Sequence, residues 1–233
     1  MYKRILMKLS GEALGGDQGI GFDHDKARKI ISQIKELKQS GVELGLVIGG
    51  GNIWRGRSNT DMDMVKSHNI GMMGTIVNSM YMAAMLNEAG LKARAITPFA
   101  IPSMTEGFFK DDVMKYLADG EILVFGGGCG QPFLSTDTGA VMNALKIEAD
   151  ALFLAKSVDG VYDSDPKENP NAVKFDKITF SEVLDKKLKV IDLPAASLCL
   201  ENNIDAVVFD LNVEGNIMKN VRGEITGTLI TNE

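Results

Sequence analysis

The chain has 233 residues, 45% of which are hydrophobic, and its formal net charge is −6. This acidic balance, with no dense run of lysine and arginine, argues against a nucleic-acid-binding surface, although local cationic side chains and backbone N–H groups can still bind a phosphorylated ligand. The two cysteines are too few for a disulfide framework, and the sequence shows neither a membrane span nor a signal peptide, so we expect a cytoplasmic protein that binds no membrane.

Predicted strands and helices alternate through most of the sequence. This alternation is typical of parallel strands joined by crossover helices, and it predicts an α/β fold, a three-layer αβα sandwich around a mostly parallel sheet. No repeat or linker divides the chain, so we expect residues 1–233 to form one domain. The predicted strands, in chain order, are Arg4–Leu9, Glu43–Ile48, Ala93–Thr97, Ile122–Phe125, Ala151–Ala155 and Ala206–Asp210.

Apolar residues at helical spacing predict the connecting helices. Before the second strand, this spacing is set by Ile30, Ile31, Ile34 and Leu37. The next predicted helix, Gly71–Ala89, is rich in methionine, and we interpret its methionine stripe as core or an oligomer interface rather than a cofactor site. The apolar stripe of this helix comprises Met72, Met73, Ile76, Met80 and Met85.

The second half of the chain predicts two more helices and one irregular segment. One helix covers Asp137–Ile147 and follows the capping residues Ser135 and Thr136. A short helix covers Phe180–Leu184. Between them, Asp159–Lys177 contains two prolines and many polar residues, which indicates a surface excursion rather than a domain boundary.

The first candidate ligand-binding segment follows the first predicted strand and contains Lys8, Ser10 and Gly11. Ligands bind at the carboxyl ends of strands in open α/β sheets, and a lysine there can reach a phosphoryl group while small neighbours admit backbone N–H groups. The alternative is a solvated lysine after an edge strand. The segment matches neither the P-loop nor the dinucleotide-binding glycine pattern.

The second candidate segment, residues 47–56, contains three consecutive glycines directly after a predicted strand. Consecutive glycines cost backbone entropy, which a chain tolerates where a ligand must approach the main chain closely. Arg55 follows with a planar donor group suited to phosphoryl oxygens. The alternative is a mobile turn, but the preceding strand and the following arginine favour a phosphate-binding loop.

The third candidate segment, residues 125–137, is a glycine-rich loop that runs into a predicted helix. A helix N-terminus favours an anion, Gln131 and loop amides can bind a base edge, and Phe133 can pack against a ring. Asp137 lies close to this anion site, and the alternative role for it is to cap the helix. Three such loops at one sheet edge would bring two phosphate-bearing ligands together, which predicts phosphoryl transfer.

At these residues the sequence closely resembles the bacterial UMP kinases of the amino acid kinase superfamily. The resemblance covers nearly the whole chain and rests on blocks in the order of that family: KRILMKLSGEAL, VIGGGNIWRG, GQPFLSTD, SVDGVYDSDP, FSEVL, LKVIDLPAASLC and GTLI. It implies transfer of the γ-phosphoryl of ATP to UMP, with Mg²⁺ held mainly by the phosphates. It also implies a homohexamer that GTP activates and UTP inhibits.

The resemblance implies a role for each matching residue. Lys8 stabilises the migrating phosphoryl group, and Asp137 orients that lysine and the metal-bound phosphates. The implied ATP-binding residues are Lys8, Leu9, Ser10, Gly11, Gly51, Arg55, Lys156, Tyr162 and Asp165. The implied UMP-binding residues are Gly50, His68, Cys129, Gly130, Gln131, Pro132, Phe133, Leu134, Ser135 and Thr136. The implied loop for GTP activation comprises Gly16, Asp17, Gln18, Gly19, Ile20 and Gly21.

Three positions depart from the family pattern. His68 stands where the family commonly has an aspartate expected to contact the UMP ribose, and a neutral histidine can still accept a hydrogen bond from a hydroxyl. Cys129 and Gln131 replace the usual threonine and asparagine of the third loop, so contacts to uracil can differ. The phosphate contacts and the fold are expected to be those of the family.

The acceptor chemistry requires no activating base. A phosphomonoester has a second pKa of about 6, so a UMP phosphate is largely dianionic at neutral pH and attacks without one. Lys8, Arg55, loop amides and Mg²⁺ are expected to offset charge in the transition state. Two alternatives remain open: a relative that phosphorylates acetylglutamate or carbamate, and a non-catalytic nucleotide-binding oligomer. The FLSTD sequence and the lack of an appended regulatory domain favour UMP.

Overall fold

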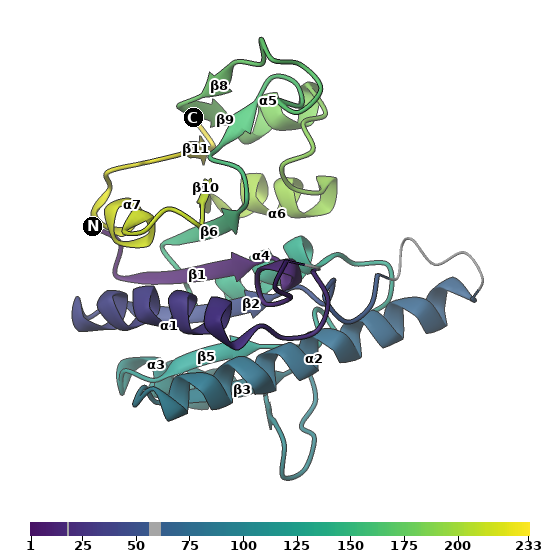
Figure 1. The fold of residues 1–233 in the computed structure, drawn as a ribbon, viewed down its shortest axis with the longest axis vertical. Helices are drawn as coiled ribbons and strands as arrows, with labels where there is room; N and C mark the ends of the chain where they lie inside the picture. The colour runs from purple at the N-terminus through teal and green to yellow at the C-terminus, as the bar shows by residue number, and fades with distance from the viewer. Residues whose placement is uncertain (18, 56–61) are drawn as a thin grey trace.

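The computed structural model describes residues 1–17, 19–55 and 62–233. Nine strands from these residues form one sheet, and each adjacent pair is parallel except β10 with β11. Figure 1 shows the strands stacked through the middle of the molecule. In spatial order they are β4 (Glu106–Gly107), β3 (Ala93–Thr97), β5 (Ile122–Phe125), β2 (Glu43–Ile48), β1 (Arg4–Leu9), β6 (Ala151–Lys156), β10 (Asp205–Asp210), β11 (Thr228–Thr231) and β9 (Lys177–Thr179).

Helices cover both faces of this sheet, which confirms the predicted αβα sandwich. Side chains alternate between the two faces of a strand, so Met7 and Leu9 pack with one helical layer and Leu6 with the other. The first layer contains α1 (His24–Gln39), α2 (Met64–Glu88) and α7 (Asn216–Arg222). The second contains α3 (Lys110–Ala118), α4 (Thr136–Lys146), α5 (Phe180–Asp185) and α6 (Leu193–Asn202).

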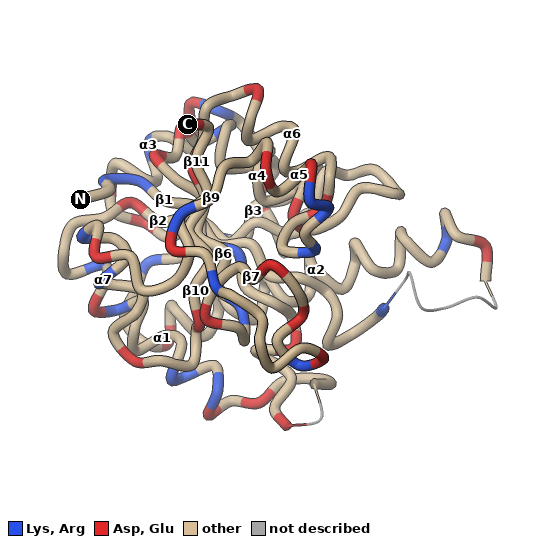
Figure 2. Tube along the Cα trace, turned by 90° about the horizontal axis from the view of Figure 1, so that it is seen from above, with Lys and Arg blue, Asp and Glu red and all other residues tan. Residues whose placement is uncertain are grey.

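The predicted strand boundaries hold closely. Four strands have the predicted bounds, and β6 and β10 each gain one residue, Lys156 and Asp205. The apolar runs were sufficient because these strands are buried on both faces, so continuous hydrophobic sequence marks them. Viewed from above, lysine and arginine are interspersed with aspartate and glutamate around the outside of the described chain, without a continuous basic stripe in that view (Figure 2).

The helix predictions need two corrections. Helix α2 begins at Met64 rather than Gly71, because Asp63 caps it by accepting a hydrogen bond from the Lys66 amide at 3.1 Å. Helix α4 begins at Thr136, and its cap is Ser135, whose hydroxyl accepts from the Thr138 amide at 3.0 Å. Asp137 is therefore not the cap of α4.

Several short elements were not predicted. They are β4, α3, α6, α7, β9, β11, the one-turn 3-10 helix η1 (Gly11–Ala13), and the antiparallel pair β7 (Val161–Tyr162) and β8 (Lys174–Phe175). The pair β7–β8 lies within the predicted surface excursion, so that segment has regular structure of its own. Among the described residues, no helix has the length and apolarity needed to cross a membrane.

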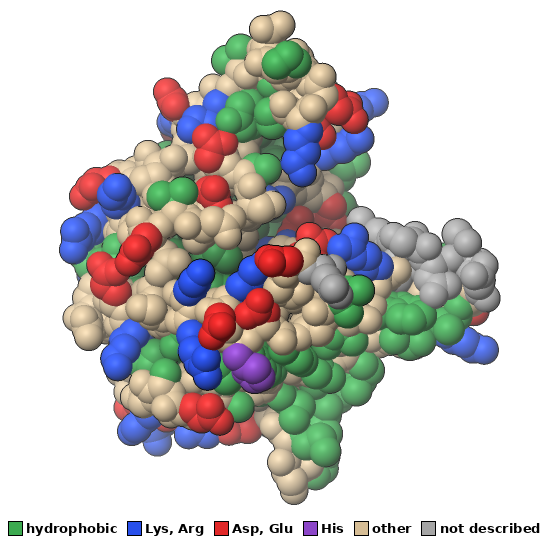
Figure 3. All heavy atoms as spheres, viewed as in Figure 1, with side chains coloured by type: hydrophobic (Ala, Val, Ile, Leu, Met, Phe, Trp, Pro, Cys, Tyr) green, Lys and Arg blue, Asp and Glu red, His purple; other side chains and the backbone are tan. Residues whose placement is uncertain are grey.

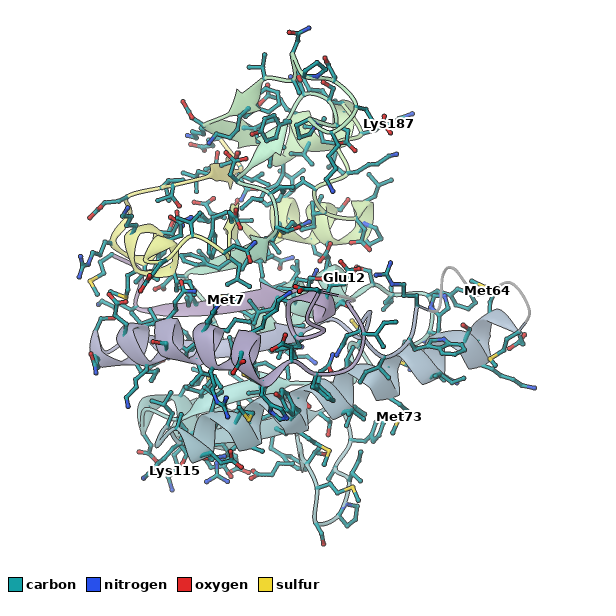
Figure 4. All side chains as sticks on the ribbon, in the orientation of Figure 1. Met7, Glu12, Met64, Met73, Lys115 and Lys187 are labelled. Atoms are coloured by element: carbon teal, nitrogen blue, oxygen red, sulfur yellow. The ribbon has the colours of Figure 1, made fainter. Side chains whose placement is uncertain are left out.

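The methionines of α2 divide between core and surface. Met82 is fully buried, and Met80 and Met85 pack partly buried against the same cluster. Met73, by contrast, is 50% exposed. In Figure 4, Met64 and Met73 are labelled along α2, while Met7 lies inward on β1. The core interpretation is therefore confirmed for the first group, and the oligomer interface stays a prediction.

Candidate active site

Three glycine-rich loops meet at the carboxyl ends of β1, β2 and β5. The first two are in direct contact, because a Cβ at Gly11 would lie 2.3 Å from the Gly49 carbonyl oxygen. A Cβ at Gly50 would lie 2.8 Å from the Gly71 carbonyl oxygen of α2. Only glycine fits these two positions without displacing main chain. The predicted convergence of the loops is confirmed.

A buried ion pair lies where the loops meet. The Lys8 ammonium, on β1, is 2.9 Å from the carboxylate Oδ1 of Asp137 in the first turn of α4, and the two side chains are only 14% and 17% exposed. The pair joins residues far apart in sequence because β1 and the start of α4 reach the same edge of the sheet. Pairing with lysine, rather than helix capping, is thus the contact of Asp137.

Lys156 adds a second cationic group near this pair. Lys156 is the last residue of β6, and its ammonium donates to the Val190 carbonyl. Burial lowers the pKa of Lys156, and nearby Lys8 lowers it further, whereas Asp137 opposes the shift. Two ammonium groups around one carboxylate give this edge a positive balance, which suits phosphate oxygens.

A cavity of about 310 Å³ opens beside the ion pair, between the loops and one face of α2. Predicted site residues supply ten of its lining positions: Lys8, Gly50, Gly51, His68, Cys129, Gln131, Leu134, Ser135, Thr136 and Asp137. Trp54 and Gly128 also line it, and they lie within the second and third candidate segments, although no role was predicted for either. The other lining residues come from α2 and were missed by sequence reasoning: Gly71, Met72 and Thr75. Recurrence at helical spacing from His68 through Thr75 was the signal that could have identified α2 as a wall.

His68 lines this cavity and also holds the third loop. Its Nδ1 accepts a hydrogen bond from the Phe133 amide at 3.0 Å, so we assign the proton of the neutral ring to Nε2. The buried Nε2 has no hydrogen-bond partner among the described residues. The acceptor nitrogen is engaged by the Phe133 amide in this arrangement, and the expected hydrogen bond from a hydroxyl stays a prediction. Phe133 itself has a positive φ of 70° and lies over the imidazole, with ring centroids 5.0 Å apart.

Thr75 ties the third loop to the same helix. The Gly127 amide donates to the Thr75 hydroxyl at 2.8 Å, and that hydroxyl donates to the Met72 carbonyl at 2.7 Å. Together with the contact between His68 and Phe133, this attaches the loop to α2 at two points. Burial raises the pKa of the Cys129 thiol in the same loop, so the thiol remains protonated at neutral pH.

Arg55 lies outside the 310 Å³ cavity. Its guanidinium is 60% exposed and pairs with the Glu12 carboxylate, which is 54% exposed, at the rim of the site. The structure therefore does not bring Arg55 to the pair of Lys8 and Asp137. Sequence reasoning missed Glu12 as its partner, because an exposed carboxylate has no pattern that distinguishes it.

A second cavity of about 440 Å³ lies at the carboxyl ends of β1, β6 and β10. Its lining includes Ser10, Glu12 and Lys156, so it adjoins the first loop on the other side of β1 from β2. Two of the implied ATP-binding residues, Tyr162 and Asp165, line neither cavity. Tyr162 donates to Asp159 at 2.7 Å, and Asp165 accepts from the Lys167 amide at 2.9 Å. Both are occupied by bonds within the β7–β8 segment.

Other predicted residues contribute through the main chain. Leu9 is fully buried in the core, and its carbonyl accepts from the Gly49 amide at 3.0 Å. Gly130 donates to the Gly127 carbonyl at 2.9 Å, which shapes the third loop. Pro132 lies in the same loop, between two residues that contact the site. None of these three residues lines the cavity beside Lys8.

A larger cleft of about 750 Å³ lies elsewhere, between α2, β3 and residues 103–106. Three of its charged groups pair with one another: Arg94 contacts Glu106 at 2.6 Å and also pairs with Glu121. Arg94 further packs its guanidinium 4.0 Å from the Tyr116 ring centroid. The smaller cavity beside Lys8 is the better candidate, because three glycine-rich loops and the pair of Lys8 and Asp137 converge there.

The comparisons with known proteins agree with this geometry. Residues 3–210 match the amino acid kinase family. The chain belongs to that family. It is similar to the crystal structure of UMP kinase from Bacillus anthracis, with 36% identity and a TM-score of 0.96, covering 100% of this chain and 97% of the other. The UMP kinase from Ureaplasma parvum matches with 32% identity and a TM-score of 0.92, covering 99% of each chain. The uridylate kinase from Archaeoglobus fulgidus matches with 26% identity and a TM-score of 0.74, covering 97% of this chain and 99% of the other.

In this member of the amino acid kinase family, the predicted GTP loop lies beside the second glycine-rich loop. The Gly21 amide donates to the Asn52 carbonyl at 2.9 Å. Asp17 pairs with Lys26 at 3.2 Å and is fully exposed. Gly16, Gly19 and Gly21 have positive φ values, and Ile20 is 73% exposed. Gln18 lies outside the described residues.

The residues around the cavity beside Lys8 offer only one carboxylate as a potential metal ligand. Asp137 is the carboxylate that lines the cavity beside Lys8, and no cluster of three or more potential ligands occurs in the described parts of the chain. Mg²⁺ commonly binds through one or two carboxylates together with substrate phosphates. Asp137 is thus the lining carboxylate that could contact a phosphate-bound metal, and magnesium itself stays a prediction.

Proposed function

We propose that this chain is a UMP kinase, which transfers the γ-phosphoryl of ATP to UMP and yields UDP and ADP. The observation that carries this proposal is the buried pair of Lys8 and Asp137, which lies beside a cavity enclosed by three glycine-rich loops. The UMP kinase structures that match over the full chain support the choice of nucleotide. The expected setting is de novo pyrimidine nucleotide biosynthesis in the cytoplasm.

The two cavities suggest separate places for the two nucleotides. We assign UMP to the cavity lined by His68, Gly50 and several residues of the third loop, among them Gln131 and Thr136. We assign the ATP phosphates to the adjoining side of β1, where Ser10 and Lys156 line the second cavity. Lys8 lies on β1 between these two sides and can reach a phosphoryl group that passes from one to the other.

The reaction depends on positioning and charge. The UMP phosphate is largely dianionic, since its second pKa is about 6, and it needs no general base. Lys8 would donate to the migrating phosphoryl group, and Asp137 would hold the ammonium in place. Magnesium, when bound with ATP, would neutralise charge on the phosphates, with Asp137 as its protein-side carboxylate. Arg55 must exchange Glu12 for phosphate before it can take part.

The direct test is a coupled assay of ADP release with magnesium ATP. Purified enzyme is offered UMP, CMP, acetylglutamate and carbamate in separate reactions. We expect turnover with UMP far above turnover with the other three. Preferred use of acetylglutamate or carbamate would assign the chain to another activity of its family, and no turnover with any acceptor would favour a non-catalytic nucleotide-binding protein.

We also propose self-association, with a homohexamer as the expected state. One stripe of α2 exposes apolar side chains at helical spacing, namely Ile70, Met73 and Val77, which are 38%, 50% and 42% exposed. Figure 3 shows hydrophobic side chains gathered over α2 and the loop below it. An exposed apolar surface of this kind is typical of an interface between subunits.

Sedimentation velocity tests the assembly with Met73→Glu combined with Val77→Glu. We expect the wild type to sediment as a hexamer and this variant as a smaller species. Lys187→Glu, at the opposite end of the molecule in Figure 4, is the matched control and should leave the assembly intact. GTP activation and UTP inhibition are further expectations, and initial rates with each effector test them.

A further inference from the structure

Two buried asparagines form a reciprocal amide pair behind the site. Asn52 and Asn78 are 2% and 0% exposed. The Asn52 Nδ2 donates to the Asn78 Oδ1 at 3.1 Å, and the Asn78 Nδ2 donates to the Asn52 Oδ1 at 2.8 Å. Asparagine is unfavourable in the middle of a helix, where Asn78 lies, so tertiary contacts must account for its presence.

Each amide also donates to a main-chain carbonyl of a different loop. Asn78 donates to the Gly49 carbonyl at 2.7 Å, and Asn52 donates to the Gly21 carbonyl at 2.9 Å. The Gly21 amide returns a bond to the Asn52 carbonyl at 2.9 Å. The pair therefore joins three segments: the loop that ends at Gly21, the second glycine-rich loop and helix α2.

The same face of α2 also holds the third loop. Thr75 and Asn78 are three residues apart, so they lie on one side of the helix. Thr75 accepts a hydrogen bond from the Gly127 amide of the third loop, while Asn78 donates one to the Gly49 carbonyl of the second loop. Because Thr75 and Asn78 are at fixed positions on one rigid helix, their contacts set the distance between the second and third loops across the cavity. Gly50 and Gly51, directly after Gly49, line that cavity beside Lys8.

We propose that Asn52 and Asn78 are positioning residues that hold the second glycine-rich loop in register with Lys8 and link the Gly21 loop to it. This inference rests on the proposed phosphoryl transfer for its kinetic consequence. Neither residue lines the cavity, so both act through the loop amides of Gly50 and Gly51. Buried amides whose donors are all satisfied specify one geometry, and a misplacement of about 1 Å can cost about 100-fold in rate.

The test compares Asn52→Ala, Asn78→Ala and the double variant with wild type. We expect kcat to fall about 10- to 100-fold in each, with a smaller change in the KM for UMP. The double variant should lose no more than either single variant, because the two side chains act as one unit. Additive losses, or an unchanged kcat in Asn78→Ala, would overturn the proposal.

Asn220→Ala is the matched control. Asn220 is also a fully buried helical asparagine, but it lies on α7 and bonds to the Asn216 carbonyl and to Thr226. Its loss should lower the melting temperature about as much as Asn78→Ala does while leaving kcat near wild type. If kcat fell equally in both variants, Asn78 would have only a structural role.

Amide hydrogen exchange separates this inference from the proposed function. In Asn78→Ala, peptides that contain Gly21 or Gly49 should exchange faster, whereas peptides from α7 should not change. This readout applies even if the wild type makes no UDP, an outcome that would refute the proposed function alone. Unchanged exchange at both loops would show that the pair does not link them.

Discussion

The two sides of the site are held by different kinds of contact. On the acceptor side, His68 and Thr75 of α2 bond directly to amides of the third loop, at Phe133 and Gly127. On the proposed donor side, the rim is held by the exposed ion pair of Arg55 and Glu12. Exposed ion pairs contribute only about 0 to 1 kcal/mol each. If the proposed function holds, we therefore expect the acceptor side to be formed before substrate arrives and the donor side to be completed by its nucleotide.

Lys8→Ala tests the point where the two sides meet, and it should have the largest effect. Removing one preorganised donor to a transition state typically lowers kcat about 100- to 1000-fold. We expect a loss of that size with little change in the KM for UMP, measured by steady-state kinetics. Lys115→Ala, an exposed lysine on α3, is the control and should keep full activity. A large rise in the KM for UMP with unchanged kcat would assign Lys8 to binding instead.

His68→Ala tests whether the acceptor side is preformed. The variant leaves the Phe133 amide without its partner and removes a side chain that lines the cavity, so the KM for UMP should rise about 10-fold. His68→Asp supplies a new acceptor to that amide and should stay within about threefold of wild type. If the aspartate variant were as weak as the alanine variant, the Nε2 donor rather than the loop contact would be the important feature of His68.

The outline of the fold was predictable from the sequence, and much of the site was not. Buried strands such as β1 and β2 are continuous apolar runs, and they need no tertiary information to be recognised. Short elements such as β4 and β7 have too few residues to show a period, so tertiary pairing defines them. Glycine-rich sequence indicated the loops, because main chain approaches main chain at Gly11 and Gly50.

Partners across the site were harder to predict than loops. The pairing of Lys8 with Asp137 was implied only by the resemblance to the family, because strand and helix patterns alone do not show which loops lie side by side. The exchange of His68 for a family aspartate was visible, but its hydrogen-bonding role depends on which nitrogen meets Phe133. The bond between Arg55 and Glu12 had no signal, since exposed charges can pair in many ways.

Glu12→Ala and Arg55→Ala test the weaker donor side. Arg55 must leave Glu12 to reach a phosphate, so removal of Glu12 should lower the KM for ATP by about twofold to threefold. Removal of Arg55 should raise that KM by about fivefold, and neither change should alter the KM for UMP. Initial rates at varied ATP measure both effects. The KM for ATP must shift in opposite directions in the two variants. Shifts in the same direction would contradict the idea that Glu12 and the ATP phosphates compete for the Arg55 guanidinium.

The smallest effect concerns the thiol of Cys129 on the acceptor side. Burial raises its pKa, so alkylation should be slow at pH 7 and should accelerate as pH rises and the thiolate forms. Burial raises the pKa of Cys199 to about 12, so that thiol should stay unlabelled. Mass spectrometry after iodoacetamide treatment measures both sites, and UMP should slow labelling of Cys129. Labelling of Cys129 at pH 7 as fast as that of a free cysteine would contradict a preformed, closely packed acceptor loop.

Strand β1 has four strands on each side in the spatial order of the sheet. A strand bonded on both edges is the least able to shift, because any displacement must carry its neighbours with it. Lys8, the proposed catalytic lysine, is thus carried by a strand whose main chain is bonded on both edges, to β2 and to β6. We therefore expect the movements that admit a nucleotide or release a product to occur in the loops on either side of β1, while Lys8 keeps its place.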